Sequence, residues 1–332
     1  MSTLVEATGL TKDFTRRRGW LAGNEPPVRA VDRVDLAIAR GETLGLVGES
    51  GCGKSTTGRL LLRLIEPTAG AVRFEGIEIA TLSKPALRRM RSRMQIVFQD
   101  PYGSLNPRLT VAETVMEAFT IHHVGSRTER WRRAAETIDL VRLPRSAMRR
   151  YPHEFSGGQR QRINIARALA LRPSFIVCDE AVSALDVSVQ AQIVNLLQDL
   201  QRELDLTYLF ISHNLAVVRH ISNRIAVMYL GRIVEIGEAD AFFARPIHPY
   251  SRALLAAIPA HHPDAAKRRP LLNEEAFGTG SAGQGCPFAP RCIFAEDRCR
   301  RSDPSLLDLP NGRTVACHRA ADGSLPDAGV ST

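Results

Sequence analysis

The chain has 332 residues, of which 44% are hydrophobic, and its 44 basic and 35 acidic residues give a formal net charge of +9. No run approaches the roughly 18 to 20 consecutive apolar residues of a membrane-spanning helix, and the N-terminus lacks the pattern of a secretory signal. We therefore expect a soluble cytoplasmic chain of one large domain or two ordinary ones. The basic residues are spread along the chain, so charge alone identifies neither a nucleic-acid nor a membrane partner.

Short apolar segments alternate with helical patterns, which predicts an α/β fold with a mainly parallel sheet covered on both faces. A buried strand is expected at 42–47, followed by a glycine-rich turn and a helix over 54–66. Further strands are expected at 94–98, 174–178, 208–211, 225–229 and 233–236, and further helices at 159–171, 189–204 and 215–221. A helical pattern over 111–141 predicts a helical subdomain at about 105–165.

A glycine-rich segment, 48–55, lies between the first of these strands and its helix and fits the pattern G-x-x-x-x-G-K-[ST]. We call it the phosphate loop, because its backbone N–H groups and the positive end of the helix suit phosphate oxygens. Lys54, one of only four lysines in the chain, is expected at the β and γ phosphates, and Ser55 at Mg²⁺. The flanking elements favour this interpretation over a chance glycine-rich turn. The predicted ATP-binding residues here are Gly48, Glu49, Ser50, Gly51, Cys52, Gly53, Lys54, Ser55 and Thr56.

Two further segments suit phosphate chemistry. The strand at 174–178 leads into Asp179 and Glu180, of which the first suits Mg²⁺ and the second can polarise an attacking water. Ser156 is a natural helix N-cap, and Gly157 and Gly158 expose N–H groups at a positive helix end. Taken alone, these segments also fit a solvated strand end and an ordinary N-cap.

In this order the motifs resemble those of the ATP-binding-cassette (ABC) family. Phe155–Gln159 resembles the family's signature motif, with Phe in place of the commoner Leu, and Gln99 corresponds to the Q-loop glutamine. Asp186 corresponds to the D-loop aspartate, His213 to the switch histidine, and Phe14 to the aromatic residue that stacks on adenine. The implied fold over residues 1–258 is a P-loop NTPase cassette with a mainly parallel central sheet, an antiparallel β region and the helical subdomain.

The resemblance also implies a mechanism. Two cassettes face each other head to tail, so that ATP in one phosphate loop is covered by Ser156, Gly157, Gly158 and Gln159 of the other. ATP binding closes the pair and hydrolysis releases it. Glu180 acts as general base, His213 contacts the γ-phosphate and Gln99 reports occupancy to a partner. Mg²⁺ is expected at Ser55, Asp179 and Gln99.

Segments 99–107, 151–159, 183–192 and 248–250 resemble the dipeptide and oligopeptide importer ATPases. This implies a subunit on the cytoplasmic face of the inner membrane that pairs with a second ATPase and with two permease subunits. A heterodimer with a related but non-identical ATPase is favoured over a homodimer. A periplasmic solute-binding protein acts indirectly, and nucleic acid is not expected. The alternatives are an importer ATPase for nickel or another small solute, and a soluble ABC ATPase acting on nucleic acid. A single phosphate-loop motif without a long coiled coil favours the transporter class.

Four of the six cysteines, Cys286, Cys292, Cys299 and Cys317, crowd the last fifth of the chain. They fall in an expected C-terminal extension, residues 259–332, that begins where the composition changes. Four soft ligands suit a tetrahedral zinc site or an iron-sulfur cluster, although CxxC pairs are absent. Some peptide-importer ATPases carry a 4Fe–4S cluster in this segment, so the resemblance makes a cluster the first expectation. Zinc, a disulfide and free thiols stay open.

Overall fold

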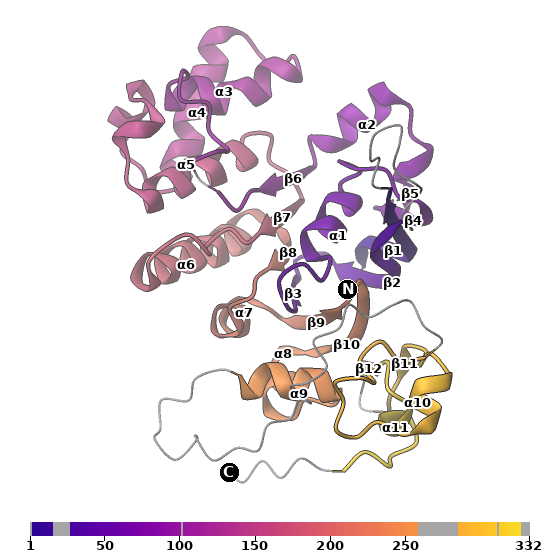
Figure 1. Ribbon diagram of the computed structural model, residues 1–332. Helices are drawn as coiled ribbons and strands as arrows, with labels where there is room; N and C mark the ends of the chain where they lie inside the picture. The colour runs from indigo at the N-terminus through magenta and orange to yellow at the C-terminus, as the bar shows by residue number, and fades with distance from the viewer. Residues whose placement is uncertain (1, 16–26, 101, 258–284, 311, 327–332) are drawn as a thin grey trace, which may run out of the picture.

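The computed structural model describes residues 2–15, 27–100, 102–257, 285–310 and 312–326 (Figure 1). Residues 259–284, which open the expected C-terminal extension, lie outside them. In the described parts of the chain, no helix combines the length and the apolar character needed to cross a membrane.

The larger sheet has eight strands in the order β11-β12-β10-β9-β3-β8-β7-β6 (Figure 1). Its parallel strands are β3 (Thr43–Val47), β6 (Met94–Val97), β7 (Phe175–Asp179), β8 (Thr207–Ile211) and β9 (Arg224–Tyr229). An antiparallel edge follows, made of β10 (Arg232–Glu238), β12 (Thr314–Val315) and β11 (Leu307–Asp308). The expected parallel sheet is therefore confirmed. The sequence did not predict that strands of the extension would complete this sheet.

The smaller sheet is antiparallel, in the order β2-β1-β4-β5. It consists of β1 (Thr3–Phe14), β2 (Val28–Ala39), β4 (Ala69–Phe74) and β5 (Ile77–Glu78). Side chains of β2 alternate between buried and exposed, as in a strand with one face on a core. This is the antiparallel region that the family resemblance implied.

Helix α1 (Lys54–Leu61) contacts strands of both sheets. It is shorter than the expected 54–66, because the backbone turns left-handed at Arg63, where φ is 48°. Pro67 therefore does not end the helix.

Three helices form the helical subdomain, namely α3 (Val111–Ile121), α4 (Arg127–Leu140) and α5 (Gly157–Leu169), with 3-10 turns η2 (Arg145–Arg149) and η3 (Pro152–Glu154). The single helical pattern expected over 111–141 is two helices. The second helix has its own N-cap, since the Ser126 side chain accepts from the Glu129 N–H. The remaining helices are η1 (Ile79–Thr81), α2 (Lys84–Arg91), α6 (Val187–Leu204), α7 (Leu215–Ile221), α8 (Ala239–Ala244), α9 (Pro249–Ala256), α10 (Asp297–Arg301) and α11 (His318–Ala321).

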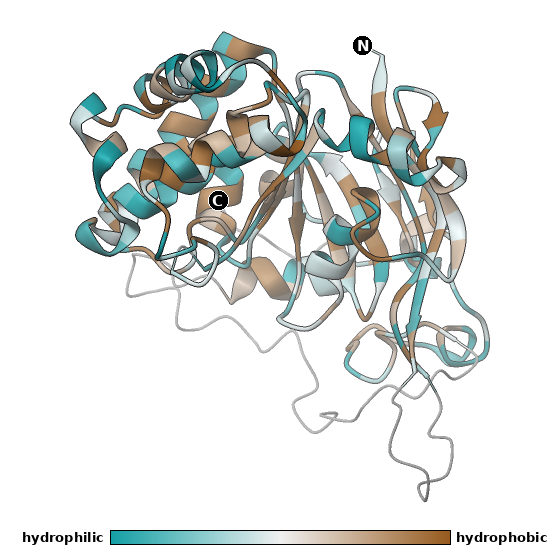
Figure 2. Ribbon diagram, turned by 90° about the horizontal axis from the view of Figure 1, so that it is seen from above, coloured by the Kyte–Doolittle hydropathy of each residue, from teal (hydrophilic) through white to brown (hydrophobic). Residues whose placement is uncertain are grey.

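Hydrophobic residues concentrate in the central strands and in the helix positions that cover them (Figure 2). They form two large buried clusters. One includes residues of α3, α5 and α6, and the other lies against the smaller sheet and α1. This packing fixes the carboxyl ends of the parallel strands, where the predicted site residues lie.

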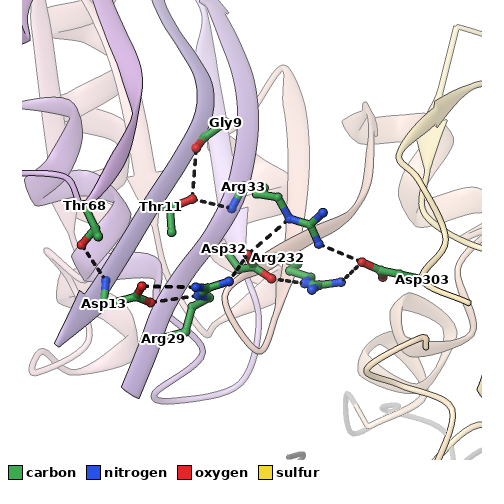
Figure 3. A network of polar contacts seen from close by, with 9 residues as sticks. All are labelled: Gly9, Thr11, Asp13, Arg29, Asp32, Arg33, Thr68, Arg232 and Asp303. Atoms are coloured by element: carbon green, nitrogen blue, oxygen red, sulfur yellow. Dashed lines mark hydrogen bonds and ion pairs between the residues drawn. The ribbon is translucent and has the colours of Figure 1, made fainter. Parts of the chain in front are cut away.

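The extension is also tied to the cassette by polar contacts (Figure 3). The Asp303 carboxylate accepts from Arg33 at 2.9 Å and from Arg232, and Arg232 also donates to Asp32. Burial acts to raise the pKa of Asp32, but Arg232, Arg33 and Arg29 together hold that pKa below its usual value. The network joins β2, the first residue of β10 and the extension.

Candidate nucleotide-binding site

The phosphate loop follows β3, which is buried along its whole length, and its last two residues, Lys54 and Ser55, are the first two of α1. Its glycines are required by close backbone approach. A Cβ on Gly48 would lie 2.1 Å from the Met228 carbonyl oxygen, and one on Gly53 would lie 2.2 Å from the Ala30 carbonyl oxygen. Gly53 also has a φ of 109°, which side chains disfavour. At these two positions the loop backbone therefore leaves no room for a side chain, and only glycine fits.

Lys54 is 4% exposed, and its ammonium lies against the phosphate loop. The Nζ atom donates to the carbonyl oxygens of Gly48 at 2.9 Å and Glu49 at 2.8 Å. The start of α1 adds positive potential at the same place. An ammonium that is held by carbonyl oxygens of the loop, and that forms no ion pair among the described residues, is suited together with the helix end to anionic phosphate.

The two carboxylates at the carboxyl end of β7, its last residue Asp179 and the following Glu180, have different surroundings. Asp179 is buried and accepts from Ser55 Oγ at 2.6 Å, which brings together two of the predicted Mg²⁺ ligands. Burial raises the pKa of Asp179, and the Ser55 hydrogen bond offsets part of this effect. A hydroxyl and a carboxylate in contact form a donor set of the hard oxygen type that Mg²⁺ prefers.

The side chains of the other two predicted catalytic residues, Gln99 and His213, both approach the Glu180 carboxylate. Its Oε2 atom accepts from Gln99 Nε2 at 2.8 Å and lies 3.5 Å from His213 Nδ1. The Glu180 backbone is left-handed, with a φ of 50°, and its N–H donates to the Ile211 carbonyl at 3.0 Å. The three side chains follow β6, β7 and β8, whose carboxyl ends share one edge of the sheet. Gln99 is directed to Glu180, and its predicted Mg²⁺ contact stays a prediction.

Phe14 ends β1 with 43% of its surface exposed. Lys12 Nζ lies 5.2 Å from the centroid of the Phe14 ring. An exposed ring with a cation nearby is suited to stack with a planar base, as predicted for adenine.

The signature segment begins α5. The Ser156 side chain accepts from the Gln159 N–H, and the Gln159 side chain accepts from the Ser156 N–H at 3.1 Å, so the two form a capping box. A Cβ on Gly158 would lie 2.4 Å from Val189 of α6, which explains the glycine. Asp186 is the N-cap residue of α6. Within the described residues, no hydrogen bond joins Ser156–Gln159 to the phosphate loop of the same chain.

The four C-terminal cysteines, Cys286, Cys292, Cys299 and Cys317, line one small cavity of about 20 Å³. We call it the thiol cavity. All six cysteines of the chain are free thiols, so the disulfide alternative is absent from this structure. Burial raises the pKa of Cys286 to about 12 and that of Cys292 to about 11. Over the described ranges, no group of three or more His, Cys, Asp or Glu side chains is arranged to hold a metal ion.

Two residues at the phosphate loop were not predicted from the sequence. Arg291, in the extension, donates to both carboxylate oxygens of Glu49, and the Tyr250 hydroxyl accepts from the Glu49 N–H at 2.9 Å. Tyr250 belongs to the 248–250 segment that resembles peptide importers. The sequence offers no comparable signal for Arg291, beyond its position next to Cys292.

The fold and the site define an ATP-binding cassette. Residues 31–183 match the family model described as ABC transporter, and residues 234–299 match that described as Oligopeptide/dipeptide transporter, C-terminal region. The chain belongs to the ABC transporter ATPases.

Similar proteins span nearly the whole chain. A probable peptide ABC transporter ATP-binding protein of Sinorhizobium fredii, y4tS, is 54% identical over 95% of this chain and 89% of its own. The oligopeptide transport ATP-binding protein AppF of Bacillus subtilis is 46% identical over 95% and 97%. The solved cassette MJ0796, a dimer in a post-hydrolysis state with ADP and Pi, is 31% identical, with a TM-score of 0.63 over 71% of this chain and 99% of that one.

Proposed function

We propose that this ATPase energises import of dipeptides or oligopeptides through a membrane transporter. The names of y4tS and AppF support a peptide substrate, and the match at 234–299 supports it independently. In this proposal the chain lies on the cytoplasmic face of the inner membrane, against two permease subunits. A second, related ATPase forms the other half of the nucleotide sandwich.

The observation that carries the chemistry is the convergence of Gln99 and His213 on the Glu180 carboxylate, beside the Ser55–Asp179 pair. Glu180 accepts the proton of the attacking water, and His213 contacts the γ-phosphate. Residues of the phosphate loop hold the ATP phosphates. Ser55 and Asp179 would hold Mg²⁺, which when bound would supply positive charge to the phosphate oxygens. We assign Ser156–Gln159 to the ATP of the partner cassette, as the resemblance to the ABC family implies; among the described residues they make no hydrogen bond to the phosphate loop of their own chain.

The substrate is tested in a reconstituted complex of this chain with its permeases and second ATPase. We expect ATP turnover to rise when a binding protein loaded with peptide is added, and not with a Lys54→Ala subunit. Stimulation by a nickel-loaded binding protein instead would contradict the peptide assignment. ATPase activity raised by DNA or RNA, without recruitment to membranes, would favour the soluble nucleic-acid class. The mass of the purified complex separates a homodimer from a heterodimer.

We propose further that the thiol cavity binds a soft metal centre, with a 4Fe–4S cluster as the form to test first. The support is the donor set, four thiols around one cavity. A cavity of about 20 Å³ is the size of a single small ion, so a cluster requires the thiols to move apart. We expect anaerobically purified protein to contain iron and sulfide and to absorb in the visible range. Colourless protein with stoichiometric zinc would contradict the cluster, and metal-free protein would contradict both.

A further inference from the structure

The C-terminal extension holds the phosphate loop at Glu49. Arg291 Nη1 and Nη2 donate to the two Glu49 carboxylate oxygens at 3.0 and 2.9 Å, a bidentate geometry that fixes orientation as well as distance. Tyr250 accepts from the backbone N–H of the same residue. Glu49 is thus restrained at both its side chain and its backbone, by elements distant from it in the sequence.

The Arg291 guanidinium is itself held in place by aromatic rings. Its central carbon lies 5.8 Å from the centroid of Tyr229 and 6.0 Å from that of Phe288. Phe288 is fully buried and packs on Tyr229 and Tyr250 at centroid distances of 5.2 and 5.5 Å. The Arg291 side chain is only 17% exposed. Such a packed guanidinium loses less conformational freedom on pairing than a fully exposed one.

The same short segment, Cys286–Cys292, lines the thiol cavity. Cys286, Phe288 and Cys292 all face that cavity, and Arg291 precedes Cys292 directly. Backbone hydrogen bonds close successive turns along the segment, from Ala289 to Cys286, from Arg291 to Phe288 and from Cys292 to Ala289. Cys286, Arg291 and Cys292 therefore belong to one continuous, hydrogen-bonded segment.

We propose that Arg291 is a positioning residue for the phosphate loop. We propose also that a change at the thiol cavity alters the affinity for ATP, because the segment Cys286–Cys292 connects the cavity to Arg291. The inference rests on the proposed ATP site and not on the identity of the imported solute. Arg291 neutralises a carboxylate that lies within a loop built for phosphate. When this contact is lost, Glu49 adds an unpaired negative charge to the phosphate loop, and the loop must be ordered by ATP itself.

The first test measures the Kd of purified full-length protein for a fluorescent ATP analogue. We expect Arg291→Gln to raise this Kd about 3- to 10-fold, the effect of a partly exposed bidentate pair and the associated ordering of the loop. Arg291→Lys should recover part of the loss. Arg301→Gln is the matched control, because Arg301 belongs to the same extension but pairs with Asp297 at the exposed surface. A Kd for Arg291→Gln within twofold of that of the control would overturn the proposal.

The second test asks whether the effect passes through Glu49 and through the cavity. In the Arg291→Gln background, Glu49→Gln should lower the Kd, because the unpaired charge is removed. Cys317→Ser changes the thiol cavity far from Arg291 in sequence. It should raise the Kd in the otherwise native chain and have no further effect with Arg291→Gln. An additive effect, or none in the native background, would contradict transmission through Arg291.

Different results would contradict the proposed ATP site and the proposed role of Arg291. If the native chain does not bind the analogue, or if Lys54→Ala binds it equally well, the ATP site is wrong. If the native chain binds it and depends on Lys54, but not on Arg291, only the present inference is wrong. Thermal unfolding of each variant separates a local effect on the loop from loss of the fold.

Discussion

Replacement of Glu180 by Gln is expected to lower ATP turnover by at least about 100-fold while leaving ATP binding intact. The glutamine keeps the size of the side chain, and its amide can still pair with Gln99 and His213, which contact Glu180 in the native chain. It cannot accept the proton of the attacking water. The variant should therefore accumulate as a closed, ATP-bound pair of cassettes. Phosphate release measured alongside analogue binding separates the two effects.

The matched control for this variant is Glu203→Gln. Glu203 is an exposed carboxylate in the last turn of α6, which leads into the amino end of β8, whereas the catalytic residues follow the carboxyl ends of their strands. It should turn over ATP as the native chain does. Near-native turnover by Glu180→Gln would remove Glu180 from the role of general base, and loss of ATP binding would point to a structural role.

Replacement of Arg313 by Met is expected to lower the free energy of unfolding by about 3 to 5 kcal/mol. Arg313 forms an ion pair with Glu235, and Glu235 is fully buried in β10. Glu235 also accepts from the N–H groups of Ile247 and His248 at 3.0 and 2.8 Å, so the carboxylate cannot easily move to water. Without Arg313 it is a buried charge that lacks its cationic partner. Urea denaturation gives the change in stability.

Two further variants separate charge from packing. Adding Glu235→Gln to Arg313→Met should recover a large part of the stability, because a neutral amide still accepts the two backbone hydrogen bonds. Arg301→Met, which breaks an exposed ion pair, should stay within about 0.5 kcal/mol of the native chain. A comparably small change for Arg313→Met would show that the buried pair does not anchor the extension.

The sequence predicted most of the cassette because its signals are local. Strand β3 and helix α1 are separated by the glycine-rich loop, and the prediction that Lys54 and Ser55 belong there needs no tertiary information. The parallel strands are nearly continuous apolar runs with helices between them, and these were predicted within one or two residues. The strands of the smaller sheet were not located, because alternating half-buried segments give a weaker signal than buried runs. The length of α1 was overestimated because a left-handed residue at Arg63 leaves no pattern in the sequence.

By itself, the sequence determined the class of protein, the phosphate loop and the residues expected around the phosphates. These follow from motifs whose members are close in the chain and whose chemistry depends on spacing. Only the tertiary structure decided that Gln99 and His213 meet at Glu180, that the extension completes the sheet of the cassette, and that Arg291 reaches Glu49. Each of these contacts joins residues at least 33 positions apart. Such contacts depend on the order of the strands in the sheet and on how side chains pack, and the local spacing of residues determines neither.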